Sequence, residues 1–132
     1  MTPLCNFAQS KALKSLGYNW DTKAGYAENE DGTYEEWHDR EWELNRLDVY
    51  PYMDDYKAPT IPDAIRFFRI EKGMHGHVFP VFSGTLKWGY GIVDIAEFIA
   101  KKQDEPPYFS TYDQAESALL DRLIELTTAK QD

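Results

Sequence analysis

The sequence predicts an α+β fold, in which a small antiparallel sheet carries two or three helices packed mainly on one face. Two observations predict it. Apolar residues recur at helical spacing after Asn6, Thr60 and Thr111, and they alternate with polar or glycine residues from Leu86 to Ile92. The chain has 132 residues, so the usual size of domains predicts one domain over residues 1–132.

The first predicted helix runs from Asn6 to Gly17. Asn6 can cap it together with Gln9, and Gly17 suits the left-handed position after its last turn. The apolar stripe of this helix consists of Ala8, Ala12, Leu13 and Leu16.

A β-hairpin is predicted next, with strands at Lys23–Asn29 and Thr33–Trp37. Asp31-Gly32 between them favours a tight type I′ turn. A helix starting at Thr33 competes with the second strand, because Glu36 could complete a capping box. Leu47–Pro59 holds two prolines and three tyrosines and is predicted to be an irregular connection.

The second helix is predicted after Thr60, with Pro62 in its first turn, where a missing N–H does no harm. Gly73 ends it. Its buried face should consist of Ile61, Ala64, Ile65 and Phe68.

Two more strands are predicted at Val78–Phe82 and Leu86–Ile92, around a turn at Ser83-Gly84-Thr85. Pro80 cannot donate to a β-ladder, which indicates an edge strand or a bulge. Ala96–Lys102 could extend the second strand or form a helical turn, and both alternatives stay open.

The last helix begins at Thr111, which forms a capping box with Gln114, and extends to about Thr128. Its apolar stripe should pack on the sheet. This stripe consists of Ala115, Ala118, Leu119, Leu123 and Leu126.

Acidic residues are concentrated between Asp21 and Lys57, where twelve acidic residues face four basic ones, a formal −8 of the total −9. Such a charge opposes binding to nucleic-acid phosphates and to anionic membranes. Cys5 is the single cysteine, so no intramolecular disulfide is expected. With no secretory signal recognisable, we expect a cytoplasmic, soluble protein without a cofactor.

Three stretches carry a family resemblance: Lys11–Tyr18, Ala58–Arg69 and Tyr112–Leu120. The second has an A-P-T start followed by A-x-x-aromatic-aromatic-R, and the third has the pattern Y-x-x-A-x-x-A-L-L. In this order they resemble small uncharacterised proteins of Bacteroides-type gut bacteria and their phages or mobile elements. The resemblance implies an origin in a phage or mobile element, and it implies no activity.

His75-Gly76-His77 is the strongest metal candidate, because an H-x-H on a strand points both imidazoles to one face. A zinc site needs further ligands, such as His38 or a carboxylate brought near by the fold. Without a recognisable third ligand we expect solvated histidines in a loop between helix and strand, and no metal site.

The acidic, aromatic-rich segment is the predicted binding surface, and its partner is expected to be a protein. No catalytic group of residues is recognisable, so the prediction is a non-enzymatic accessory or interaction protein, a monomer or a weak homodimer. Two alternatives stay open: an acidic nucleic-acid mimic that inhibits a DNA-binding protein, and a small metal-dependent enzyme around His75 and His77. The candidate binding residues are Glu35, Glu36, Asp39, Tyr50, Tyr52 and Tyr56.

Overall fold

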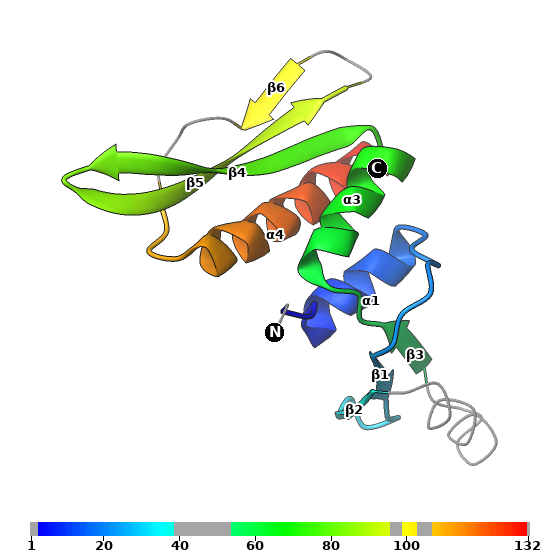
Figure 1. Cartoon of the computed structure of the whole chain (residues 1–132). Coiled ribbons are helices and arrows are strands. Elements are labelled where there is room, and N and C mark those ends of the chain that lie inside the picture. The colour runs from blue at the N-terminus through cyan, green and yellow to red at the C-terminus, as the bar shows by residue number, and fades with distance from the viewer. Residues whose placement is uncertain (1–2, 39–53, 96–98, 103–106, 132) are drawn as a thin grey trace. The chain divides into compact units, whose positions relative to one another are not determined.

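The computed structural model describes residues 3–38, 54–95, 99–102 and 107–131. It confirms the α+β class, with two antiparallel sheets of three strands where one sheet was expected (Figure 1). The chain divides into two compact units. We call Leu4–Thr60 the N-terminal unit, and Ile61–Asp132 with residues 1–3 the C-terminal unit. The single-domain organisation stays a prediction.

The N-terminal unit begins with helix α1, Phe7–Ser15. Its capping box is formed as predicted: the Asn6 side chain accepts from the Gln9 N–H at 2.8 Å, and the Gln9 side chain accepts from the Asn6 N–H at 3.0 Å. After the last turn Gly17 has φ of 95°, a conformation that costs glycine little. Local signals alone thus define this helix.

The sheet of this unit has the order β2-β1-β3, with β1 at Gly25–Glu28 and β2 at Tyr34–Trp37. These strands confirm the predicted hairpin and exclude the competing helix. The predicted type I′ turn is wrong, because the N–H of Asn29 bonds to the carbonyl of Thr33 at 2.7 Å and closes a three-residue loop. Gly32 takes the positive φ, 89°, that such a loop needs.

Strand β3, Asp54–Lys57, lies inside the segment expected to be irregular. It pairs with β1 so that Tyr56 lies opposite Tyr26. Pairing with a distant strand, rather than local propensity, orders these charged residues. A β-bridge between Leu4 and Thr60 joins the two ends of the unit. The part of the segment upstream of β3 lies outside the described residues.

The C-terminal unit contains helices α3, Ile61–Glu71, and α4, Tyr112–Gln131. Its sheet has the order β4-β5-β6, with strands at Met74–Ser83, Thr85–Asp94 and Ile99–Lys102. Both helices lie on the same face of this sheet, as predicted (Figure 1). Strand β6 is a separate strand that pairs with β5, so neither an extension of β5 nor a helical turn holds for its residues. Residues 96–98 lie outside the described residues.

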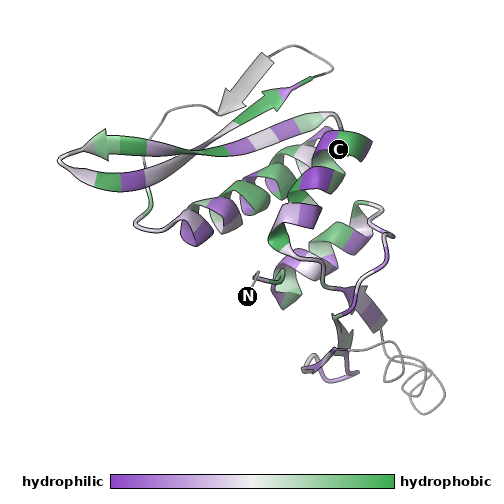
Figure 2. Ribbon diagram, in the orientation of Figure 1, coloured by the Kyte–Doolittle hydropathy of each residue, from purple (hydrophilic) through white to green (hydrophobic). Residues whose placement is uncertain are grey.

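The core of the C-terminal unit is largely aliphatic where α4 meets the sheet. Hydrophobic and hydrophilic residues alternate along this helix (Figure 2). Leu119 and Leu123 are 1% and 0% exposed, and Ile92 on β5 is fully buried. Leu119 lies directly over Gly76 of β4, where a Cβ would come within 2.7 Å of the leucine side chain.

The start of α4 is also as predicted. Thr111 and Gln114 form the capping box, with hydrogen bonds of 3.1 and 3.3 Å. As in α1, a cap and its partner three residues later are enough to place the first turn.

Pro80 lies on the edge strand β4, as predicted. Its partner Trp88 exchanges both backbone hydrogen bonds with Phe109, each 2.8 Å, on the opposite side of β5. Because hydrogen-bonded and non-bonded pairs alternate along an antiparallel ladder, the Pro80 nitrogen faces away from β5. The proline therefore removes a donor only from the outer edge of the sheet.

Candidate functional site

The six predicted binding residues differ in their exposure to solvent and in whether the structure describes them. Glu35 and Glu36 are exposed on β2, and Tyr56 is buried on β3. Asp39, Tyr50 and Tyr52 lie outside the described residues. Two of the six thus remain candidates on the described surface.

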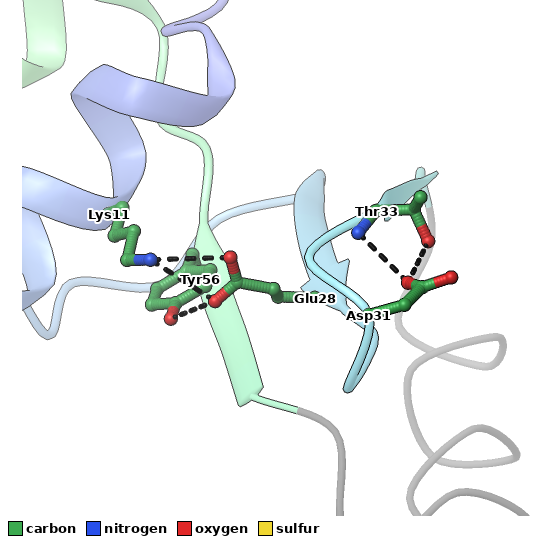
Figure 3. Close-up of polar contacts among 5 residues, drawn as sticks. All are labelled: Lys11, Glu28, Asp31, Thr33 and Tyr56. Atoms are coloured by element: carbon green, nitrogen blue, oxygen red, sulfur yellow. Dashed lines mark hydrogen bonds and ion pairs between the residues drawn. The ribbon is translucent and has the colours of Figure 1, made fainter.

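Tyr56 belongs to the interior of the N-terminal unit, which corrects its assignment to the binding surface. It is 6% exposed, and its hydroxyl donates to Glu28 Oε1 at 3.0 Å. The ammonium group of Lys11 lies 3.2 Å from both oxygens of the same carboxylate (Figure 3). The ring also lies beneath the Lys14 ammonium, 5.0 Å from the ring centroid. These contacts engage the ring and the hydroxyl of Tyr56 inside the fold.

Tyr34, which the sequence did not single out, is the exposed aromatic residue of this region. Its ring stacks on Phe7 of α1 with centroids 4.2 Å apart and an interplanar angle of 3°. Tyr26 packs edge-on against both rings. Tyr34 nevertheless remains 49% exposed. A ring held in one orientation and half open to solvent is suited to contact a partner at a small entropy loss.

The register of the hairpin determines which backbone groups of β2 point outward. The Asn29–Thr33 pair is hydrogen-bonded, so the Ala27–Glu35 pair bonds inward as well. The intervening residues of β2, Tyr34 and Glu36, therefore direct their N–H and C=O groups away from β1. Among the described residues β1 is the one neighbour of β2 in the sheet. We call the outward side of Tyr34–Trp37 the β2 edge.

Carboxylates surround the β2 edge. Glu30, Asp31, Glu35 and Glu36 are exposed. Within the described part of the chain, none of them pairs with a lysine or an arginine; Glu36 has His38 at 3.3 Å. This differs from Glu28 on the inner strand, whose charge Lys11 balances. Among the residues described, the edge therefore presents uncompensated negative charge.

Asp31 has a structural role in the loop beside this edge. Its Oδ1 accepts from the backbone N–H of Thr33 at 3.0 Å and from the Thr33 hydroxyl at 2.6 Å (Figure 3). These hydrogen bonds favour the ionised carboxylate and lower the pKa of Asp31 below its usual value. The loop thus holds its charge and its shape at neutral pH.

Trp37 anchors the end of β2 to the sheet. It is 2% exposed, and its Nε1–H donates to Asp55 Oδ1 at 2.9 Å. Its indole covers the backbone of Gly25 directly opposite, where any Cβ would collide with the ring. Because only glycine leaves this space, the pair fixes the register of β2 against β1.

His75 and His77 lie within strand β4, not in the expected loop. Alternation places both on the face of the sheet opposite α3 and α4, with ring centroids 6.0 Å apart. Both are half-buried, and desolvation, with a smaller contribution from His75, lowers the pKa of His77. No group of three or more metal-ligating residues occurs among the described residues. The alternative of a metal-dependent enzyme gains no further ligand from the described fold.

Two buried carboxylates of the C-terminal unit serve packing. Asp94 is fully buried and forms an ion pair with Lys130 at the end of α4. Glu116 is 6% exposed and shares a hydrogen bond with Tyr112, and burial raises the pKa of this carboxyl group. Each therefore has a polar partner that offsets part of the free-energy cost of its desolvation.

Comparison of the chain with known protein families, with characterised proteins and with solved structures found no match. None of the helices in the described ranges is both long and apolar enough to cross a membrane. The arrangement on β2 can pair charges, stack an aromatic ring and bond to a neighbouring backbone. These are the interactions of a binding surface.

Proposed function

We propose that the chain is a non-enzymatic protein-binding module that recognises a basic partner through the β2 edge and the carboxylates around it. The observation that carries this proposal is the exposed, stacked ring of Tyr34 next to carboxylates that pair with no lysine or arginine of the described chain. Charged groups in such a surface accelerate association and select the sign of the partner, and an aromatic anchor prolongs the complex.

The distribution of the acidic residues favours a protein partner over mimicry of a nucleic acid. Glu35 and Glu36 are consecutive on one strand, so their side chains point to opposite faces of the sheet. A mimic needs carboxylates in one continuous row at the spacing of phosphates. The resemblance to proteins of phages and mobile elements agrees with an accessory role, and this origin belongs to the proposal.

Selection from a library of random displayed peptides tests the proposal and requires no identified partner. We expect the immobilised chain to enrich peptides with an excess of lysine and arginine. A variant with Glu30→Gln, Glu35→Gln and Glu36→Gln should bind the selected peptides at least about threefold more weakly, mainly through slower association.

The matched control changes three exposed acidic residues of the C-terminal unit by the same total charge: Glu71→Gln, Asp121→Asn and Glu125→Gln. It should bind the selected peptides as the unchanged chain does. Equal weakening in both variants would reduce the effect to net charge and remove the hairpin from the proposal. Enrichment of peptides without excess positive charge would contradict the proposal itself.

A further inference from the structure

We infer that the β2 edge binds its partner by strand addition: an extended segment of the partner pairs with Tyr34 and Glu36 and continues the sheet beyond β2. This inference rests on the proposed function and specifies the kind of segment that is bound. Both residues direct a backbone donor and a backbone acceptor to the outside, as the register of the hairpin requires. An added strand supplies partners for these groups.

The side chains along the edge define what the added strand should carry. Tyr34 and Glu36 lie on the face covered by α1, and Glu35 lies on the other face. In a sheet, residues directly opposite each other on neighbouring strands have their side chains on the same face. The residues opposite Glu35 and Glu36 should therefore be basic, and the residue opposite Tyr34 should be apolar or aromatic. The bound segment thus contains two consecutive basic residues next to an apolar one.

The outer edge of β4 is protected against pairing with another strand and the β2 edge is not. This difference supports a role of the β2 edge in strand addition. Pro80 removes a backbone donor from the outer edge of β4, a common protection against unwanted pairing. The β2 edge has no proline and no lysine; its residues are Tyr34, Glu35, Glu36 and Trp37.

Glutamates on an edge oppose pairing between two copies of that edge, because like charges would meet. They permit pairing with a basic segment. The edge is therefore selective for a partner of opposite charge, which argues against a second copy of this chain as the occupant.

The test uses two synthetic peptides of identical composition and charge. One has a central Lys-Arg-Val flanked by threonines, and the other has Lys-Val-Arg in the same frame. We expect the peptide with consecutive basic residues to bind at least about threefold more tightly, equivalent to about 0.7 kcal/mol, since each exposed ion pair contributes about 0.2–1 kcal/mol. Equal binding of the two peptides would contradict the predicted register.

A proline variant tests the backbone pairing. Glu36→Pro removes an outward N–H and leaves the bonds to β1 intact, whereas Glu36→Gln removes the charge alone. We expect Glu36→Gln to lower the affinity for the Lys-Arg-Val peptide about two- to fivefold. Glu36→Pro should lower it about tenfold further, because one backbone hydrogen bond to the peptide is lost. Equal affinities of the two variants would exclude strand addition. A cooperative thermal unfolding transition shows whether each variant is folded.

Amide hydrogen exchange in the unchanged chain tests strand addition even if the proline variant unfolds. The N–H groups of Tyr34 and Glu36 should gain protection when the Lys-Arg-Val peptide binds, while that of Glu35, already bonded to β1, should change little. Binding without this pattern would overturn strand addition and leave the proposed function standing. If neither peptide binds and the displayed library yields no basic peptide, the proposed function fails as well.

Discussion

The two sheets of this protein are stabilised by different side chains. In the N-terminal unit, α1 meets its sheet through stacked and edge-on rings of Phe7, Tyr26 and Tyr34. In the C-terminal unit, α4 meets its sheet mainly through leucines, among them Leu119 and Leu123, with an edge-on ring contact between Tyr112 and Trp88 near its start. The second interface follows the rule that an aliphatic stripe is buried on a sheet. The first depends on ring orientation and on polar groups at the ends of the rings.

The difference has a physical cause in the size of the covering helix. Helix α1 has 9 residues and α4 has 20. A short helix contributes few side chains, and an aromatic side chain buries more area than an aliphatic side chain does. Buried tyrosine hydroxyls need hydrogen-bond partners. The Tyr26 hydroxyl, for example, donates to the Cys5 carbonyl at 3.0 Å. Polar contacts around Tyr56 and Glu28 therefore lie directly beside the aromatic core of the N-terminal unit (Figure 3).

Truncation of the leucine interface should have the largest effect. Leu119→Ala or Leu123→Ala should lower the free energy of unfolding by about 2–5 kcal/mol, because each leaves a cavity in a closely packed core. Leu126 is only half-buried, so Leu126→Ala is the matched control and should lower the free energy of unfolding by less. Urea unfolding measures the three values; a loss below about 0.5 kcal/mol at Leu119 would show that the aliphatic interface is not the main support of this sheet.

Glycines beneath aromatic rings allow a direct comparison of the two sheets. A Cβ at Gly25 would collide with the Trp37 indole and lie 2.6 Å from the Tyr56 carbonyl oxygen. A Cβ at Gly89 would meet only side chains, with the Phe79 ring at 2.9 Å. We expect Gly25→Ala to destabilise by about 1–3 kcal/mol and Gly89→Ala by less, because a phenylalanine ring moves more easily than backbone. Thermal unfolding of the two variants checks the order, and the reverse order would contradict it.

Two carboxyl groups should give the smallest effects, with opposite signs. The pKa of Asp31 is lowered from 3.8 by its hydrogen bonds, so its contribution to stability is present above that pH and is lost as the pH falls through its folded pKa. The pKa of Glu116 is raised from 4.5 by burial, so stability declines as the pH rises from 4.5 through its folded pKa.

Asp31→Asn should therefore cost stability at neutral pH and little in acid. Glu116→Gln should gain stability relative to the unchanged chain as the pH rises. Urea unfolding between about pH 3 and pH 7 measures both trends, since this range spans the ordinary carboxyl pKa values. Parallel curves for the two variants would show that neither carboxyl group is perturbed as the structure indicates.

Local signals predicted the helices and the hairpins of this fold. The capping residues Asn6 and Thr111 with their glutamine partners lie within four consecutive residues, so sequence spacing is sufficient to recognise them. The division into two sheets depends on which distant strands pair. Strand β3 consists of Asp-Asp-Tyr-Lys, a sequence with weak strand propensity that β1 orders by pairing. No local pattern contains that information.

The candidate site was predictable in its charge and not in its aromatic residue. The acidic composition of the surrounding segment is sufficient to predict that Glu35 and Glu36 are exposed. The loop-like composition around Tyr56 predicts an exposed ring, whereas its burial depends on contacts with α1 and β1. Tyr34 could have been recognised from its alternation with Glu36 on a strand with polar neighbours. Its exposure, however, depends on how far α1 covers the sheet.

The ends of the N-terminal unit meet each other. Besides the β-bridge between Leu4 and Thr60, the N–H of Cys5 donates to the carbonyl of Pro59 at 2.9 Å. The chain thus enters and leaves this unit at one place, as it does in a domain inserted into a host protein. A unit with adjacent ends can be transplanted into a surface loop of another protein, or circularly permuted by joining Leu4 to Thr60 and opening the chain elsewhere. The β1–β2 hairpin could then be moved with its unit into any scaffold whose loop ends lie as close together as Leu4 and Thr60 do.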